Sequence, residues 1–190
     1  MSSRPKLSRG KIGIALAIGA IGFAAFILVG GIQLALNQQK RAQTGMNAVA
    51  LQEAVESYFD FYSRLPGQAQ EGRELIAEGR EAQEFLLVLL AKDKDGKDLS
   101  RGRQRRFLIV DEAKHKNQGG LLYDSGSKTA LPMGLYDSWG RPFHLRFSPY
   151  DKIEIPDPLQ AGEIIRDKRV IVYSYGKDGK PGGGDDIKTW

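Results

Sequence analysis

The residues best suited to chemistry lie at the end of the chain, where three aspartates stand in a glycine-rich stretch. Asp178, Asp185 and Asp186 fall within nine residues and are separated by four glycines. Calcium binds about six to eight oxygen ligands from carboxylates, backbone carbonyls and water, and glycine lets a loop curl closely around an ion. The stretch is therefore a candidate calcium site. Aspartate and glycine are also common in plain solvated turns, so the residues alone leave both interpretations open.

Two other charged segments are interpreted as solvated surface. An EF-hand loop that began at Asp93 would need glycine at its sixth position and glutamate at its twelfth, where Asp98 and Gln104 stand. We therefore predict a polar turn over residues 92–98. The basic cluster that follows is predicted to be an exposed face, with binding of an anionic partner as the alternative. It consists of Arg101, Arg103, Arg105 and Arg106.

The remaining side chains form no known catalytic motif. The chain has no cysteine and only two histidines, His115 and His144, so a thiol nucleophile and a three-histidine zinc site are excluded. It contains neither a Gly-x-x-x-x-Gly-Lys-Ser/Thr loop nor a Gly-x-Gly-x-x-Gly turn that opens a helix after a strand. Paired carboxylates of the glycosidase type stay open. We predict that the protein is not an enzyme.

The elements that would carry the acidic loop begin with a long apolar run. Residues 12–32 contain no charged or hydrogen-bonding side chain, and the run continues to Leu36 with only Gln33 as an interruption. About 20 helical residues span a bilayer core of roughly 30 Å. We therefore predict a transmembrane helix over residues 12–36, in contact with membrane lipid. A cleaved signal peptide has a shorter apolar region, and a buried core helix is the alternative.

The charges beside this run predict its orientation. Four basic residues precede it and two follow it, and basic flanks stay on the cytoplasmic side. Residues 1–11 are thus predicted to be a basic cytoplasmic leader, and residues 37–190 a domain outside the cytoplasm. Most of the formal net charge of +5 lies in the leader, so we expect no nucleic-acid binding.

The domain over residues 37–190 is predicted to be α+β. An amphipathic helix over residues 37–62 continues the membrane helix and is stopped by residues 65–67, and a second helix is predicted over residues 71–90. The stripe of the first helix consists of Leu51, Val55, Tyr58, Phe59 and Tyr62. Strands are predicted over residues 107–110, 121–123, 143–147, 152–155 and 169–174. Helices before strands indicate a long helix packed on a small antiparallel sheet.

Three motifs occur in a particular order. The amphipathic helix ends with Tyr58-x-x-x-Tyr62-x-x-Leu-Pro66, the segment Asp137-Ser-Trp139-Gly140-Arg-Pro142 precedes a strand, and the chain ends with Ser-Tyr-Gly-Lys-Asp178-Gly, three glycines, Asp185-Asp186-Ile and Trp190. Together they resemble the major pseudopilins of bacterial type II secretion and, more broadly, the type IV pilin-like family. Residues 70–130 match more loosely and are interpreted as an insertion.

The resemblance implies a pilin-like fold, anchored in the bacterial inner membrane with its domain in the periplasm. It implies a function in a type II secretion or type IV pilus-related assembly, through association with other pseudopilin or secretion-system subunits or with itself. It also implies a structural Ca²⁺ held by Asp178, Asp185 and Asp186 with carbonyls near Tyr175. The structural residues of the motifs would be Tyr62, Pro66, Asp137, Trp139, Gly140, Pro142 and Trp190.

The N-terminus departs from the pattern of that family. Its members carry a leader that ends in glycine before phenylalanine or methionine, with a glutamate near the start of the mature chain. Here Lys11 follows Gly10, and no acidic residue precedes Glu53. Neither cleavage after Gly10 nor glutamate-guided packing into a filament is therefore implied. The alternative function is a static, membrane-tethered periplasmic binding module whose pilin-like domain does not polymerise.

Overall fold

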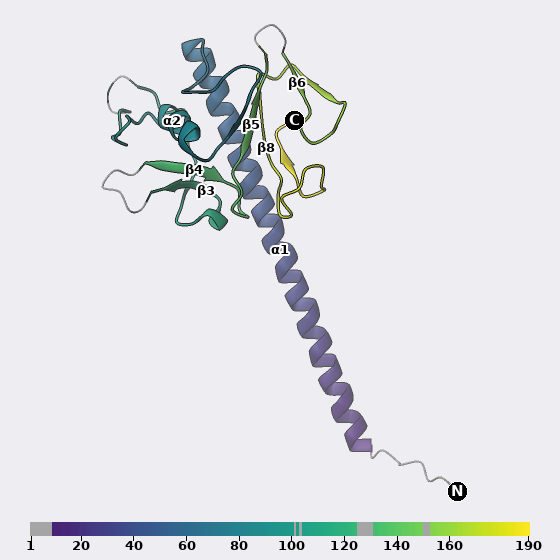
Figure 1. The fold of residues 1–190 in the computed structure, drawn as a ribbon. Helices are drawn as coiled ribbons and strands as arrows, with labels where there is room; N and C mark the ends of the chain where they lie inside the picture. Colours follow the sequence, from purple (N-terminus) through teal and green to yellow (C-terminus); the bar gives the residue numbers. More distant parts are fainter. Residues whose placement is uncertain (1–8, 101, 103, 125–130, 150–152) are drawn as a thin grey trace. The chain divides into compact units, whose positions relative to one another are not determined.

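The computed structural model describes residues 9–100, 102, 104–124, 131–149 and 153–190, with side chains from residue 30 onward. Residues Met1–Gln39 and Lys40–Trp190 form two units, and each is described by itself. Figure 1 shows the order of the elements along the chain.

One helix, α1 (Arg9–Tyr62), supplies the backbone of the first unit and continues into the second. The predicted membrane helix over residues 12–36 lies mostly outside the residues whose side chains are described, as does most of the predicted leader over residues 1–11. Among the described residues, no helix combines the length and the apolar character that crossing a membrane requires.

The part of α1 in the second unit carries the predicted apolar stripe, and its burial is confirmed. Leu51 and Val55 are fully buried and Tyr58 is 5% exposed, while Phe59 and Tyr62 are partly buried. The helix ends at Tyr62, as predicted, because the next residue adopts a positive φ of 54° and leaves the helical path.

The main sheet has the strand order β1-β5-β8-β9, and every neighbouring pair is antiparallel. Its strands are β1 (Glu74–Ile76), β5 (His144–Phe147), β8 (Val170–Ser174) and β9 (Ile187–Lys188). All five residues of β8 are buried. Leu145 and Val172 share one core with Leu51 of α1, so the sheet packs on the helix (Figure 1).

A second sheet has the order β2-β3-β4, in which β3 and β4 are antiparallel and β2 and β3 are parallel. Its strands are β2 (Glu112–Ala113), β3 (Gly120–Tyr123) and β4 (Pro132–Tyr136), with a 3₁₀ turn, η1 (Lys116–Gln118), after β2. The hairpin β6 (Glu154–Pro156) and β7 (Ile164–Arg166) is separate. The domain is therefore α+β, with a long helix and mainly antiparallel sheets.

The second helix is shorter than predicted. Instead of beginning near Glu71, α2 runs over Arg80–Leu89, and residues that we assigned to its first turns form β1. Leu75 is buried as predicted, but in a strand. Two glycines with positive φ, Gly72 at 70° and Gly79 at 91°, separate this segment from helical structure on both sides.

The strand predicted over residues 107–110 is also wrong. The backbone N–H groups of Phe107 and Leu108 both donate to the carbonyl of Leu89, at 2.9 and 3.0 Å. The segment is therefore held by the end of α2 and joins no sheet. Leu108, like Phe85 and Leu121, nonetheless belongs to the main core, so described parts of residues 70–130 fold onto the domain.

Candidate metal site and the turn beside it

The turn between β4 and β5 is built around one buried carboxylate. Asp137 is fully buried, and its Oδ1 accepts the backbone N–H groups of Trp139, at 2.8 Å, and Arg141, at 2.9 Å. Its own N–H donates to the carbonyl of Arg141 at 2.8 Å. One side chain thus closes the turn on itself, which explains why an aspartate stands at this position.

The same turn holds the start of the C-terminal loop. The Ser174 hydroxyl donates to Asp137 Oδ2 at 2.5 Å and accepts the N–H of Gly176 at 3.1 Å. The guanidinium of Arg141 donates from Nε to the carbonyl of Gly176, at 2.8 Å, and from Nη2 to that of Lys177, at 3.1 Å. Two of the three sequence motifs are therefore bonded to each other.

Helix α1 contacts this turn as well, through residues that sequence reasoning missed. The N–H of Ser138 donates to the Thr44 hydroxyl at 3.1 Å, and the Ser138 hydroxyl donates to Gln43 Oε1 at 3.3 Å. Thr44 is fully buried. A polar residue on the apolar side of a helix indicates a hydrogen-bond partner, because burying an unpaired hydroxyl costs free energy. The position of Thr44 on that side was the sequence signal that could have predicted this contact.

The other motif residues of the turn have structural surroundings. Trp139 is partly buried against the main core, and its Nε1 is buried with no hydrogen-bond partner among the described residues. Gly140 has a φ of 88°, and a Cβ there would collide with the side chain of Asn117. Pro142 forms a bridge with Tyr136 across the turn. Far from this turn, Pro66 is buried just beyond the end of α1.

The C-terminal loop gathers the three predicted ligands through its own backbone. Asp185 Oδ2 accepts the N–H of Asp178 at 2.9 Å, and Asp186 Oδ2 accepts the N–H of Gly182 at 2.7 Å. The bond from Asp178 N–H holds the pKa of Asp185 below its usual value. Burial raises the pKa of Asp186, and the charges of Asp185 and Asp178 raise it further. The charges of Asp178 and Asp185 thus both act on Asp186.

Several oxygens of this loop fit a hard cation such as Ca²⁺. A Cβ built on Gly183 would lie 2.7 Å from Asp185 Oδ1, 3.7 Å from Asp178 Oδ2 and 3.8 Å from the carbonyl of Lys180, so these oxygens face one space. Asp186 Oδ1 is buried without a hydrogen-bond partner. In the described part of the chain, however, no three acidic, histidine or cysteine side chains are arranged closely enough to hold a metal ion. Two carboxylates face one another, and Asp186 stands beside them.

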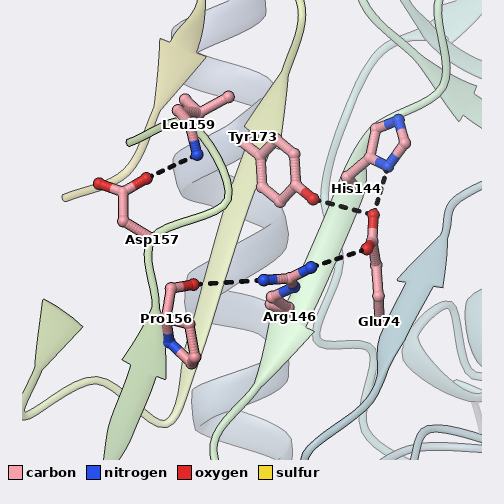
Figure 2. Close-up of polar contacts among 7 residues, drawn as sticks. All are labelled: Glu74, His144, Arg146, Pro156, Asp157, Leu159 and Tyr173. Atoms are coloured by element: carbon pink, nitrogen blue, oxygen red, sulfur yellow. Dashed lines mark hydrogen bonds and ion pairs between the residues drawn. The ribbon is translucent and has the colours of Figure 1, made fainter. Parts of the chain in front are cut away.

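The last residue closes the far end of the loop. Trp190 donates from Nε1 to Asp157 Oδ2 at 3.0 Å, and its ring meets the ring of Tyr173 edge-on at 6.0 Å. Asp157 Oδ1 in turn accepts the backbone N–H of Leu159 at 2.7 Å (Figure 2). The loop is therefore fixed at its start by Arg141 and at its end by Trp190.

A polar cluster that the sequence did not indicate joins three strands of the main sheet (Figure 2). Glu74 Oε1 accepts the Tyr173 hydroxyl at 2.8 Å and lies 2.7 Å from His144 Nδ1, and Glu74 Oε2 lies 3.4 Å from Arg146 Nη2. Burial raises the pKa of Glu74, but the hydrogen bonds with His144 and Tyr173 and the nearby positive charges outweigh it, so the net shift is downward. Burial and the Glu74 carboxylate raise the pKa of Tyr173.

This cluster is better suited to tying strands together than to catalysis. A carboxylate beside an imidazole can orient a general base. The His144 side chain, however, is only 13% exposed and is stacked on the ring of Tyr173 at 5.1 Å, with the ring of Tyr175 at 4.7 Å. Two aromatic rings and the Glu74 carboxylate therefore contact the imidazole, and little of it is open to solvent.

Comparison with other proteins gives no relative: no protein-family model, curated protein or solved structure matches this chain. The fold and the site define an α+β domain that extends from a long helix and ends in an acidic glycine loop bonded to a buried turn.

Proposed function

We propose that the protein is a pseudopilin-like subunit of a type II secretion or type IV pilus-related assembly. The observation that carries this proposal is the bonding between its two later motifs. Asp137 and Arg141 of one motif contact Ser174 and Gly176 of the other. Two motifs that are far apart in the chain but bind each other in the fold support the resemblance to pseudopilins more strongly than two unconnected short motifs would.

The long helix supports the same proposal. Its second part, around Leu51 and Val55, lies in the core of the domain. Its first described part carries apolar side chains that the chain leaves uncovered: Ile32 is 58% exposed, Leu34 65% and Leu36 47%. Apolar side chains that are exposed on more than one side of a helix are typical of a segment covered by lipid or by another protein. We propose that residues 12–36 are anchored in the bacterial inner membrane, with the domain in the periplasm, and that neighbouring subunits pack on this helix. The proposal assigns the protein no catalytic role.

Cysteine cross-linking tests the association. Because the chain has no cysteine, Leu34→Cys supplies its only thiol. Oxidation of host membranes should link this variant to a second copy or to another assembly subunit, which mass spectrometry identifies. Lys94→Cys, in an exposed loop of the domain, is the matched control and should not cross-link. If Leu34→Cys gives no linked product, or if the protein is recovered outside the membrane fraction, the proposal fails.

The alternative function, a static tethered module, is favoured by one specific observation. No acidic residue precedes Glu53, and Lys11 follows Gly10, which departs from the pattern of filament-forming relatives. The intact mass of the protein from host membranes separates the two functions. A mass that lacks residues 1–10 indicates a processed, assembling subunit. A mass that includes Lys6 and Arg9 indicates a permanent anchor and favours the static module.

We also propose that the C-terminal loop binds Ca²⁺ through Asp178, Asp185 and Asp186, where the ion would offset the repulsion that Asp178 and Asp185 exert on Asp186. A ligand that binds only the folded state stabilises it by RT ln(1 + [L]/Kd), about 2.7 kcal/mol at a hundredfold excess over Kd. The protein should therefore melt at a higher temperature in calcium than in chelator. The double substitution Asp185→Ala with Asp186→Ala should abolish the difference, whereas Asp95→Ala, an exposed loop aspartate, should keep it. Equal melting temperatures in the two buffers would rule out the site.

A further inference from the structure

An open pocket lies between the end of α1 and the segment that follows α2. Its volume is about 360 Å³, which is within the usual range for sites that accept small ligands or single side chains. One wall is aromatic: Tyr58 and Phe107 meet edge-on at 5.3 Å, and the rings of Tyr58 and Tyr62 lie 4.7 Å apart. Tyr62 and Phe107 are only partly buried, so their rings offer apolar surface to the pocket.

The rim of this pocket is positively charged. Among the described residues, Arg64, Lys92 and Arg105 line it, against the carboxylate of Asp93. Arg64 lies 6.0 Å from the centre of the Tyr62 ring and Arg105 lies 5.6 Å from that of Phe107. Among the described residues, none of the three cations forms an ion pair.

The one acid of the rim does little to neutralise these cations. Asp93 Oδ1 already accepts the backbone N–H groups of Asp95 and Lys97, each at 2.9 Å. Its side chain is therefore held by its own loop, and the three cations outnumber this one carboxylate among the described residues of the rim. Lys92 Nζ lies over the ring of Tyr123 at 4.2 Å, so an anion from outside the chain would bind mainly to the guanidinium groups of Arg64 and Arg105.

We propose that this pocket binds an acidic peptide segment of a partner protein, one in which a carboxylate neighbours an aromatic or aliphatic side chain. The carboxylate would lie between Arg64 and Arg105, because guanidinium groups bind carboxylates in a planar, bidentate geometry. The apolar neighbour would rest on Tyr62 and Phe107, since aromatic rings supply large contact areas at low entropic cost. This inference is independent of the membrane anchor and of the calcium loop.

Charge and shape favour a peptide over a nucleic acid. A nucleic acid needs a basic stripe that follows several phosphates, whereas these cations surround one hollow of about 360 Å³. The fixed carboxylate of Asp93 would repel a polyanion but leaves room for one carboxylate beside the two arginines. The three aromatic rings also provide apolar contact area, which an apolar side chain can bury and a phosphate cannot.

Fluorescence anisotropy on the full chain in mild detergent tests the proposal. The probe is a fluorescein-labelled peptide of alternating glutamate and phenylalanine, with two matched peptides in which glutamine replaces glutamate or alanine replaces phenylalanine. We expect saturable binding of the first peptide, at least about fivefold weaker binding of each matched peptide, and weaker binding as salt rises, because exposed charges are screened. A labelled oligothymidylate is titrated in parallel.

Three variants locate the binding site. Arg64→Gln with Arg105→Gln should weaken binding of the first peptide about tenfold, and Tyr62→Leu should weaken it while thermal melting confirms the fold. Arg80→Gln removes an exposed cation elsewhere and should leave the affinity unchanged. No saturable binding, an equal loss in Arg80→Gln, or tighter binding of the oligothymidylate than of the peptide would each overturn the proposal.

Discussion

Removing the Asp137 carboxylate should be among the most damaging single changes in the domain. Asp137→Ala leaves the N–H groups of Trp139 and Arg141 and the hydroxyl of Ser174 without their acceptor, in a site from which solvent is excluded. An unsatisfied buried donor costs about 1–3 kcal/mol, and rotation of the hydroxyl and entry of water relieve part of this. We expect a loss of about 3–5 kcal/mol, a large share of the roughly 5–15 kcal/mol that stabilises a typical domain.

The chain contains a natural control for this experiment. Asp93 Oδ1 accepts the N–H groups of the residues two and four positions later, each at 2.9 Å, which is the same pattern that Asp137 makes. The Asp93 turn, however, is exposed, so water replaces the lost acceptor. Asp93→Ala should therefore cost only about 0.5–1 kcal/mol. Asp137→Asn keeps Oδ1 and loses only the acceptor for Ser174, so its cost should be about 1–2 kcal/mol.

Urea unfolding of the full chain in mild detergent, followed by tryptophan fluorescence, measures these differences. The protein has two tryptophans, and Trp139 and Trp190 both report on the region concerned. The expected order of stability is wild type, Asp93→Ala, Asp137→Asn and then Asp137→Ala. If Asp93→Ala and Asp137→Ala lose the same free energy, burial of the turn contributes nothing and the reasoning is refuted.

Three further changes have defined outcomes. Gly140→Ala should destabilise the domain by about 1–3 kcal/mol more than Gly162→Ala in urea unfolding, because both glycines have a φ near 88–89° but only the first has a side chain in the way; equal losses would contradict this. Because the pKa of Glu74 is lowered by folding from its ordinary 4.5, its contribution to stability is present above that pH and is lost as the pH falls through the folded value. The stability of the wild type should thus fall more steeply below about pH 5 than that of Glu74→Gln, and parallel curves would refute the assignment. Arg141→Ala should speed hydrogen exchange in the C-terminal loop, which loses two carbonyl partners, while Lys180→Ala should not; protection that survives in Arg141→Ala would show that the guanidinium does not hold the loop.

The parts of the fold that follow from local periodicity could be predicted from the sequence. The stripe from Leu51 to Tyr62 has a helical period because it faces one core, and the structure buries it there. Residues 143–147 and 169–174 were predicted as strands from alternation and β-branched content, and the structure contains β5 and β8 at these positions. In each case the pattern of apolar residues within the element itself indicates which of its side chains are buried.

Elements fixed by contacts with distant residues were missed or misassigned. β1 is three residues long, too short to show a period, and it exists because it pairs with β5 across the register Leu75 to Leu145. The segment after Arg106 has the composition of a strand, but the N–H groups of Phe107 and Leu108 donate to the carbonyl of Leu89 at the end of α2. No local pattern reports which partner a backbone group finds, so tertiary pairing decided both cases.

The candidate site was predictable in its residue types and not in its connections. Asp178, Asp185 and Asp186 stand out as carboxylates among glycines, whereas the contacts of Arg141 with the loop depend on a turn formed by a different motif. Glu74 illustrates the same limit, since it was placed on a helix and instead joins His144 and Tyr173 across the sheet. The sequence around Arg141 and Glu74 does not indicate which distant groups these two residues bind.

The connections at both ends of the C-terminal loop limit what an ion can do there. Its start is held by Arg141 and Ser174, and its end by the pairing of β9 with β8 and by Trp190 on Asp157. None of these contacts involves a metal, so we expect the domain to fold without calcium and a bound ion to act only on the segment between them. Since the charges of Asp178 and Asp185 act on Asp186 in that segment, the proposed ion would offset this repulsion and order the loop.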